Sequence, residues 1–370
     1  MTYSQLHKSQ TLPSPMPTGR VPALDGLRGC AILLVIIWHY FHTDWFPGWI
    51  GVDLFFVLSG YLITARLLQT IHTPSYFSRF YRNRILRVFP LYYAVVIPYL
   101  IAVFYLVQKQ NFPTVAFYHE HWKSLLLFTT NWTFVLYGLP KDFSLVPLWS
   151  IAIEEQFYLI WPLLLFLVRP KFRIRQLVIG ISLVLLARTA AWLYFPSLRN
   201  TEYYNTFFRL DSLFCGSLLC LLQQSGLTCS TSLIKKIVLA LLAILLIGIG
   251  LTHDAGPQNA YFSTAGFTVN ALLFACLTHI ALHPGSKYLT RLLEFSPLRF
   301  IGNISYCLYL VHVPILLNIG PRLYHLGLAK YPTHTLALHW TSVFLCLLLS
   351  LLVSTLSYLY FESIFLRLKK

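Results

Sequence analysis

The chain has 370 residues, of which 57% are hydrophobic and only 11% are charged. Soluble domains carry about 25% charged residues, so this composition excludes an ordinary soluble protein and predicts an all-α integral membrane protein. The net charge of +16 does not indicate nucleic-acid binding, because the basic residues lie in short runs between apolar segments and no groove-reading motif is present.

Ten apolar segments are long enough to cross a hydrocarbon core of about 30 Å as helices. The proline-containing segment 1–22 lacks the apolar region of a cleavable signal and is expected to be a disordered cytosolic tail. Residues 23–364 are expected to form one transmembrane domain, and 365–370 a basic cytosolic tail. The spans are expected at 24–44, 50–69, 88–107, 147–168, 174–195, 207–224, 234–252, 261–282, 299–319 and 337–360.

The distribution of basic residues predicts which side of the membrane each connection faces. If the chain starts in the cytosol and alternates sides, the cytosolic segments hold 19 of the 28 Lys and Arg, the outer segments hold seven, and Arg28 and Arg188 lie inside spans. This bias predicts that both termini are cytosolic. Residues 122–138 are apolar but short and rich in polar residues, and a span there would move the basic RPKFRIR run outside. A re-entrant or interfacial outer element is therefore predicted, with a span as the alternative.

Charged and imidazole side chains inside apolar segments are costly, so each one is a candidate functional residue. Arg28 and His39 lie eleven residues apart in the first segment. This separation is about 16 Å and close to three helical turns, so both side chains are predicted to point to the same side of the helix. The alternative is that Arg28 extends to the interface and His39 is an interfacial imidazole.

The fourth span begins PLWSIAIEEQFYLIWP, with two adjacent carboxylates, Glu154 and Glu155, close to an apolar run. Ser150 and Tyr158 are each four residues from Glu154 and share its helix face. A carboxylate in this setting can orient an imidazole or a sugar hydroxyl. The alternative, stronger for Glu155 than for Glu154, is a glutamate that only complements the positive end of the helix dipole.

The segment FSRFYRNRILRVFP places Arg79, Arg82, Arg84 and Arg87 at the inner membrane surface. Basic residues there commonly set topology or contact lipid headgroups. Guanidinium groups also bind phosphate in a bidentate manner, which suits a phosphorylated cytosolic donor. The sequence leaves both interpretations open.

Four further polar residues lie in or beside later spans. Arg188 needs a counter-charge, for which Asp211 or a glutamate of the fourth span is a candidate. Arg209 and Asp211 are two residues apart, so each is expected to pair with a group on another helix. His312 is either a packed histidine or a second functional imidazole. The sequence contains no zinc, Walker, GxGxxG or GxSxG motif, so no metal site is predicted.

Six segments, in this order between residues 24 and 314, resemble the motifs of the membrane-bound acyltransferase family 3, a family of O-acyltransferases. LDGLRGCAILLVIIWHYFH is similar to the R-x10-H motif of that family, with Arg28 and His39 in the two places. GVDLFFVLSGYLI is similar to its second-helix motif and contains Asp53 and Ser59. The other matching segments are the arginine-rich residues 77–90, LWSIAIEEQFYLIWP, FRLDSLFCG and IGNISYCLYLVHVP.

The resemblance implies transfer of an acyl group, often acetyl, from cytosolic acyl-CoA to a hydroxyl of an envelope carbohydrate, a glycolipid or a small glycosylated metabolite. Acyl-CoA is then a substrate, and no tightly bound cofactor is expected. The implied location is the bacterial cytoplasmic membrane. Some members carry a fused SGNH-type hydrolase domain, so a separate partner is expected to replace it where it is needed.

The resemblance and the residues together suggest a role for each candidate. His39 is the expected general base, Glu154 and Glu155 its orienting carboxylates, and Arg28 a neighbour of the donor path. The donor phosphates are expected at Arg79, Arg82, Arg84 and Arg87, and the oxyanion near Asp53, Ser59 or Arg188. The remaining supporting candidates are Ser150, Arg209, Asp211 and His312.

The alternative function is a transporter or flippase for a sugar or lipid, in which the intramembrane charges would form the substrate path. The two halves of the chain show no symmetry, and the arginine-rich segment suits a phosphorylated donor. Both observations favour the enzyme.

Overall fold

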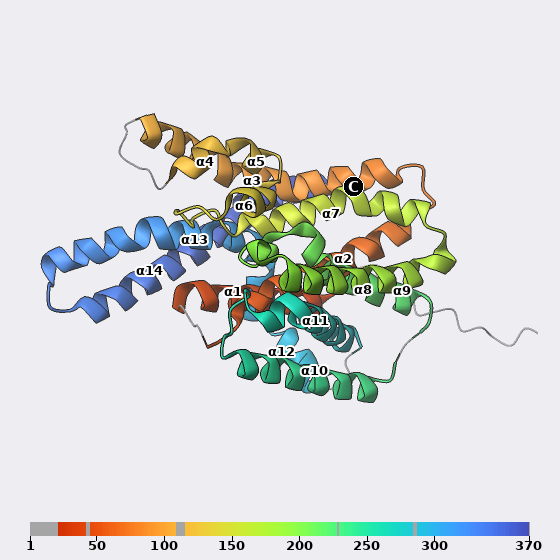
Figure 1. Cartoon of the computed structure of the whole chain (residues 1–370). Helices are drawn as coiled ribbons and strands as arrows, with labels where there is room; N and C mark the ends of the chain where they lie inside the picture. Colours follow the sequence, from red (N-terminus) through yellow and green to blue (C-terminus); the bar gives the residue numbers. More distant parts are fainter. Residues whose placement is uncertain (1–20, 42–44, 109–114, 228, 284–286, 370) are drawn as a thin grey trace, which may run out of the picture.

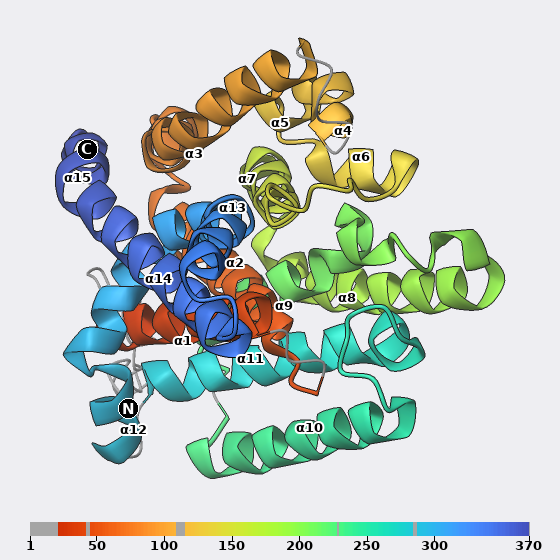
Figure 2. The ribbon, with the colours of Figure 1, turned by 90° about the vertical axis from the view of Figure 1, so that its left-hand side faces the viewer.

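The computed structural model describes residues 21–369, except 42–44, 109–114, 228 and 284–286. Residues 1–20 of the predicted tail 1–22 and the last three residues of the first predicted span lie outside the described residues, and Pro22 already belongs to the first helix. Within the described residues the secondary structure is entirely helical (Figures 1 and 2), and ten helices are long and apolar enough to cross a membrane. The all-α architecture and the ten spans are therefore confirmed.

The spans follow the predicted order. They are α1 (Pro22–Phe41), α2 (Gly51–Thr70), α3 (Tyr76–Gln108), α7 (Leu148–Leu167), α8 (Pro170–Tyr194), α9 (Thr206–Gln224), α10 (Thr231–Thr252), α11 (Phe267–Leu282), α13 (Ser296–Lys330) and α14 (Thr335–Leu356). A π-helical turn, Phe262–Gly266, precedes α11, and another, Ser357–Glu362, joins α14 to α15 (Ser363–Arg367). The short helix α12 (Lys287–Leu293) precedes α13.

Two spans are much longer than predicted. The helix α3 begins at Tyr76 rather than at residue 88, so the arginine-rich segment forms its first turns and is not a loop. The helix α13 continues to Lys330, past Pro314 and Pro321. Its 35 residues correspond to about 52 Å at 1.5 Å per residue, which exceeds a core of about 30 Å. The hairpin of α13 and α14 therefore projects beyond the bundle on the predicted outer side (Figure 1).

Residues 122–138 do not span the membrane, as predicted. They fold into α5 (Trp122–Leu126) and α6 (Thr130–Tyr137), which follow α4 (Ala116–Glu120), and all three helices are far too short to cross a bilayer. Gln156 of α7 ties this outer element to the bundle. Its amide donates to the carbonyl oxygen of Phe128 (2.8 Å) and to Oδ1 of Asn131 (2.9 Å), and its oxygen accepts from Trp132 and Thr206.

The side chain of Asn131, in α6, is fully buried. Its amide nitrogen donates to the carbonyl oxygen of Tyr204 (3.1 Å) and to the hydroxyl of Thr206 (2.8 Å). Because Asn131 also accepts the bond from Gln156, it joins α6 to α7 and α9.

Small residues bring the central helices together. In α2 and α9, a Cβ atom on Gly60 would collide with the carbonyl oxygen of Leu213, and one on Gly216 with the carbonyl oxygen of Val57. Membrane helices without a hydrophobic driving force between them commonly use such close backbone contact. Figure 2 shows α1, α2, α9 and α13 in the interior of the bundle, with α3 and α10 at its edge.

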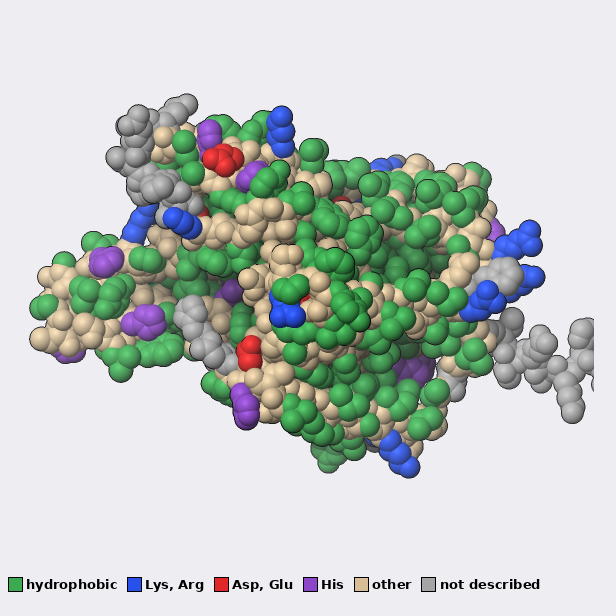
Figure 3. Space-filling model, viewed as in Figure 1, with side chains coloured by type: hydrophobic (Ala, Val, Ile, Leu, Met, Phe, Trp, Pro, Cys, Tyr) green, Lys and Arg blue, Asp and Glu red, His purple; other side chains and the backbone are tan. Residues whose placement is uncertain are grey.

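The outer surface of the bundle is apolar, as a membrane requires. Hydrophobic side chains cover most of the face in Figure 3, and Lys and Arg lie mainly toward its margins. Leucines such as Leu159, Leu239 and Leu246 are each 67% exposed on the flanks of α7 and α10. In water such exposure would be costly, but toward lipid it is favourable.

Candidate active site

Two adjoining cavities lie between the helices that carry most of the predicted site residues. The central cavity has a volume of about 140 Å³ and is walled by α1, α2, α3, α7 and α13. The mouth cavity, of about 340 Å³, lies at the predicted cytosolic ends of α1 and α2 and beside the C-terminal helix. Both are lined by Arg28, Leu62, Arg87 and Tyr306, so they adjoin at these four residues, and the two cavities together are called the arginine-lined path below.

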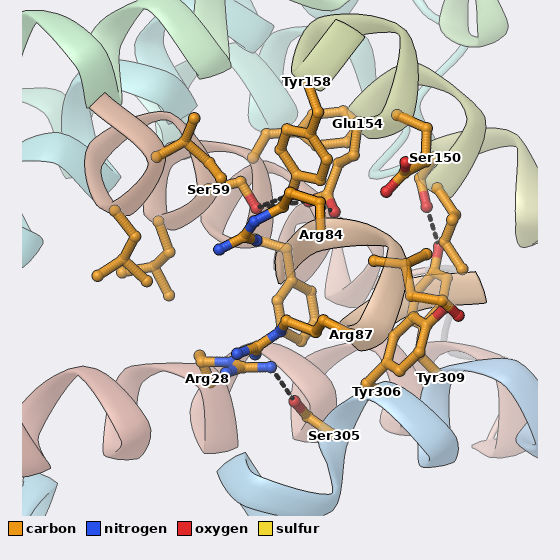
Figure 4. A pocket seen from close by; sticks show the side chains of 18 of the residues that line it. Arg28, Ser59, Arg84, Arg87, Ser150, Glu154, Tyr158, Ser305, Tyr306 and Tyr309 are labelled. Atoms are coloured by element: carbon orange, nitrogen blue, oxygen red, sulfur yellow. Dashed lines mark hydrogen bonds between the residues drawn. The ribbon is translucent and has the colours of Figure 1, made fainter. Parts of the chain in front are cut away.

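Three arginines from two helices converge on the central cavity. Arg28 of α1 donates to the hydroxyl of Ser305 (3.3 Å), and the guanidinium of Arg84 lies 5.4 Å from the ring centre of Tyr158. Arg87, one turn after Arg84 on α3, lines both cavities. Figure 4 shows the three guanidinium groups pointing into the same space.

The arginine-rich segment therefore divides between two environments. Arg84 and Arg87 line the cavity, whereas the exposed Arg82 and the half-buried Arg79 are not among its lining residues in the part of the chain that the structure describes. The helical spacing explains the division, because residues three apart share a face. Of the four arginines expected to bind the donor phosphates, only Arg84 and Arg87 face the cavity in the described part of the chain.

Glu154 lies in the cavity wall and accepts two hydrogen bonds. Ser59 of α2 donates to its Oε1 (2.8 Å), and Tyr158, one turn along α7, donates to its Oε2 (3.0 Å). The hydroxyls of Ser59 and Tyr158 are themselves 3.0 Å apart. The expected pairing of Glu154 with Tyr158 is thus confirmed, but the carboxylate is bonded to these hydroxyls and not to His39, because α2 and not α1 packs against this part of α7.

Glu155 lines the same cavity and has an unsatisfied oxygen. Its Oε1 is buried and has no hydrogen-bond partner among the described residues. A buried carboxylate oxygen without a donor is costly, so it is available for a group that a ligand brings in.

Arg28 and His39 both face α13, as their spacing predicts. Arg28 meets Ser305, and His39, about three turns further along α1, meets His312. Nε2 of His312 lies 3.4 Å from Nδ1 of His39, and the two ring centres are 5.0 Å apart in an edge-to-face arrangement. His312 is fully buried and His39 half-buried.

Neither His39 nor His312 lines either cavity within the described part of the chain, but Ser150 and Tyr309 line the central one, and Tyr309 lies next to His312. The hydroxyls of Ser150 and Tyr309 are 2.6 Å apart, and both lie close to the carbonyl oxygen of Pro147. The ring centre of Tyr309 is 5.7 Å from that of His312. A substrate at the end of the cavity would therefore be one side chain away from the imidazoles.

The remaining predicted candidates form two buried ion pairs. Arg188 pairs with Asp211 at 2.9 Å, and Arg209 pairs with Asp53, with all four side chains fully buried. The expected counter-charge of Arg188 and the expected inter-helix pairing of Arg209 and Asp211 are confirmed.

This ion-pair network receives further hydrogen bonds from the protein, although Nε and Nη1 of Arg209 have no hydrogen-bond partner among the described residues. Thr268 donates to Asp211, and Ser212 and Asn270 donate to Asp53. Within the described part of the chain none of the four charged residues lines either cavity. We therefore assign Asp53 and Arg188 to helix packing and withdraw them as oxyanion donors.

Two groups of cavity residues were not predicted. Ser305, Tyr306 and Tyr309 lie on the face of α13 that also carries His312, and a search for polar residues at helical spacing around His312 would find them. Glu362 enters the mouth cavity from the π-helical turn after α14. Its place cannot be read from periodicity, because a π turn shifts the register of the helix.

The C-terminal residues lie close to the cavity arginines. Burial, together with the positive charges of Arg87, Arg84 and Arg28, lowers the pKa of Lys369 to about 7. A crowded group of cations at the end of a cavity is suited to an anionic ligand.

The profile of the acyltransferase domain family, Acyl_transf_3, matches residues 21–359. The chain belongs to this family. Ten apolar helices and bacterial relatives make it a multi-pass integral protein of the bacterial cell membrane.

Three curated relatives illustrate the similarity. The peptidoglycan O-acetyltransferase OatA of Listeria monocytogenes is 34% identical, over 82% of this chain and 50% of its own length. The O-acetyltransferase OatA of Staphylococcus aureus is 29% identical, over 81% and 51%. The putative peptidoglycan O-acetyltransferase YrhL of Bacillus subtilis is 33% identical, over 81% and 49%. The chain thus spans about half the length of these relatives. No solved structure matches it.

Proposed function

We propose that the protein is an O-acyltransferase that transfers an acetyl group from acyl-CoA on the cytosolic side to a hydroxyl of a cell-envelope carbohydrate. The observation that carries the proposal is the arginine-lined path from the predicted cytosolic ends of the helices to the neighbourhood of His39 and His312. The names of the relatives, which include peptidoglycan O-acetyltransferases, support the acetyl group and the acceptor class.

The donor half of the reaction uses the two cavities. Arg28, Arg84 and Arg87 offer guanidinium groups to the phosphates of CoA, which they bind with charge-assisted hydrogen bonds. The thioester end of the donor then lies toward Ser150 and Tyr309. The restricted volume at this end favours a short acyl group.

The acceptor half uses His39 as general base. His39 takes the proton of the acceptor hydroxyl as the oxygen attacks the thioester carbon, and the thiol of CoA leaves. Glu154 fixes Ser59 and Tyr158 in the cavity wall, and we assign it this orienting role because its hydrogen bonds go to them.

The test is label transfer from acetyl-CoA by membranes that contain the protein, supplied with an envelope glycan extract. Wild type is compared with His39→Ala and with His334→Ala, a histidine exposed between α13 and α14. Removing the base is expected to reduce transfer by about 100-fold or more, and His334→Ala is expected to leave it unchanged. If wild type neither transfers label nor releases CoA from acetyl, propionyl or butyryl donors, the proposal fails and a transporter takes its place.

A further inference from the structure

The contact between His39 and His312 fixes where the proton sits on each ring. Nδ1 of His312 lies 3.0 Å from the carbonyl oxygen of Leu308 and 2.8 Å from that of Tyr309. A carbonyl oxygen can only accept a hydrogen bond, so Nδ1 of His312 carries the hydrogen. The neutral ring then has its lone pair on Nε2, the atom that faces His39.

The same reasoning assigns the tautomer of His39. Nδ1 of His39 lies 2.9 Å from the carbonyl oxygen of Val35 and 3.4 Å from the lone pair on Nε2 of His312. Both neighbours accept, so the hydrogen of the neutral ring is on Nδ1. The lone pair of the neutral His39 ring is therefore on Nε2, which is the atom that a general base would use.

We propose that His312 is the positioning residue for His39. It fixes the Nδ1–H tautomer of His39 and, when His39 becomes positively charged, accepts a hydrogen bond from that Nδ1–H. This inference rests on the proposed function. It gives to a neutral imidazole the task that a carboxylate performs in Ser-His-Asp triads.

The proposed transfer step balances in protons and electrons. The hydroxyl proton of the acceptor moves to Nε2 of His39, and the oxygen lone pair forms the new bond to the thioester carbon. The carbon–sulfur bond breaks with its electron pair on sulfur, and His39 returns the proton from Nε2 to the thiolate. His312 remains neutral throughout and keeps its own hydrogen on Nδ1.

The surroundings of His312 hold its ring in one orientation. The side chain is fully buried, and its two backbone acceptors lie on its own helix, α13. The ring therefore does not need another helix to hold its orientation. Glu154 does not perform this task in the observed arrangement, because its hydrogen bonds link it to Ser59 and Tyr158, whereas His39 contacts His312.

The first measurement needs no activity. In protein labelled with ¹⁵N-histidine, the His39 signals are those that disappear in His39→Ala, and the 13 histidines of the chain are separated in this way. We expect Nδ1 of His39 to be protonated and Nε2 to be unprotonated in the neutral ring. A neutral His39 protonated on Nε2 would overturn the inference, whatever the protein does with acetyl-CoA.

The second measurement compares two substitutions of His312. His312→Gln retains an oxygen near the position of Nε2 that can accept from His39, whereas His312→Phe retains a ring but has no acceptor. We expect kcat for acetyl transfer to fall about 10- to 100-fold in His312→Phe, with little change in KM for acetyl-CoA, and to recover at least partly in His312→Gln. Transfer is expressed per folded protein, measured by gel filtration.

Two results would contradict the positioning role. One is a wild-type kcat in His312→Phe, and the other is an equal loss in both variants, which would indicate packing alone. If wild type transfers no acetyl group but His39 has the expected tautomer, the proposed function fails and the geometric part of the inference stands.

Discussion

Among the basic residues of α3, Arg87 lines both cavities whereas Arg82 lies exposed on another face of the same helix. This pair offers a matched test of donor binding. Arg87→Gln is expected to raise KM for acetyl-CoA about 10- to 100-fold, because a lost charge-assisted hydrogen bond is worth about 1.5–3 kcal/mol. Arg82→Gln should change KM less than about twofold, since exposed charges contribute little. Equal effects in initial-rate kinetics would show that the arginines act only through their general positive charge.

Glu202, in the turn Glu202–Tyr204 between α8 and α9, gives a pH prediction outside the spans. The side chain is 2% exposed, and neither oxygen has a hydrogen-bond partner among the described residues. Burial raises the pKa of Glu202 from 4.5 to about 7, and the nearby hydroxyl of Ser263 and the charges of Arg188 and Arg199 offset this only in part. The folded state therefore binds the proton more tightly than the unfolded chain, and stability falls as pH rises from about 4.5 to about 7.

We expect the melting temperature of wild type in detergent to decrease between pH 5 and pH 8. The corresponding loss in the free energy of unfolding is at most about 3 kcal/mol. Glu202→Gln should flatten this part of the profile, whereas Glu120→Gln, a change of an exposed glutamate of α4, should not. A wild-type profile that rises with pH in this window, or one that Glu202→Gln leaves unchanged, would contradict the assignment.

At the residue scale the sequence predicts partners within one helix better than partners between helices. The spacing of Glu154 and Tyr158 predicts their contact, because four residues make one turn. It does not predict that Ser59 supplies the other hydrogen bond, since this depends on which helix packs against α7. The link between Glu154 and His39, expected by analogy with catalytic triads, is absent for the same reason.

At the scale of elements, the close approach of α2 and α9 depends on Gly216. Gly216→Val is expected to lower the melting temperature strongly or to abolish folding, because its side chain would collide with the carbonyl oxygen of Val57. Gly250→Val is the control, since a Cβ there meets no atom within 4 Å. Similar melting temperatures for the two variants would mean that α2 and α9 can separate without cost.

The spans could be predicted from hydropathy, but their ends could not. An apolar window locates the part of α3 that lies in lipid, while the helix begins earlier, in a polar segment of which Arg84 and Arg87 face a cavity and not lipid. In α13, Pro314 and Pro321 suggest an earlier end, yet the helix continues to Lys330. Neighbouring helices can satisfy the backbone groups that a proline frees, so proline is a weak stop signal in a membrane.

At the scale of the whole molecule, the orientation in the membrane is still a prediction from the basic residues. It can be tested with a membrane-impermeant maleimide on intact spheroplasts. The exposed Cys229, between α9 and α10, should react only after permeabilisation. The thiol introduced by His334→Cys, in a Cys229→Ser background, should react without it. The opposite labelling pattern would invert the topology and place the mouth cavity on the outer side.

The sequence predicts the number of spans and the family, because both depend on local patterns along the chain. It does not predict the cavities, which arise from five helices that are distant in sequence. Nor does it predict that only two of the four arginines of α3 line the path, until the segment is known to be helical.

The burial of Asn131 has a practical consequence for producing this protein. Asn131, Trp132 and Thr133 form an Asn-x-Thr acceptor for N-linked glycans. In the folded protein both N–H groups of the Asn131 side-chain amide donate hydrogen bonds, and the side chain is fully buried. A eukaryotic expression host could attach a sugar there only before folding, and that sugar would then keep α6 from docking. A glycosidase-sensitive band on a gel would therefore measure the misfolded fraction of a preparation.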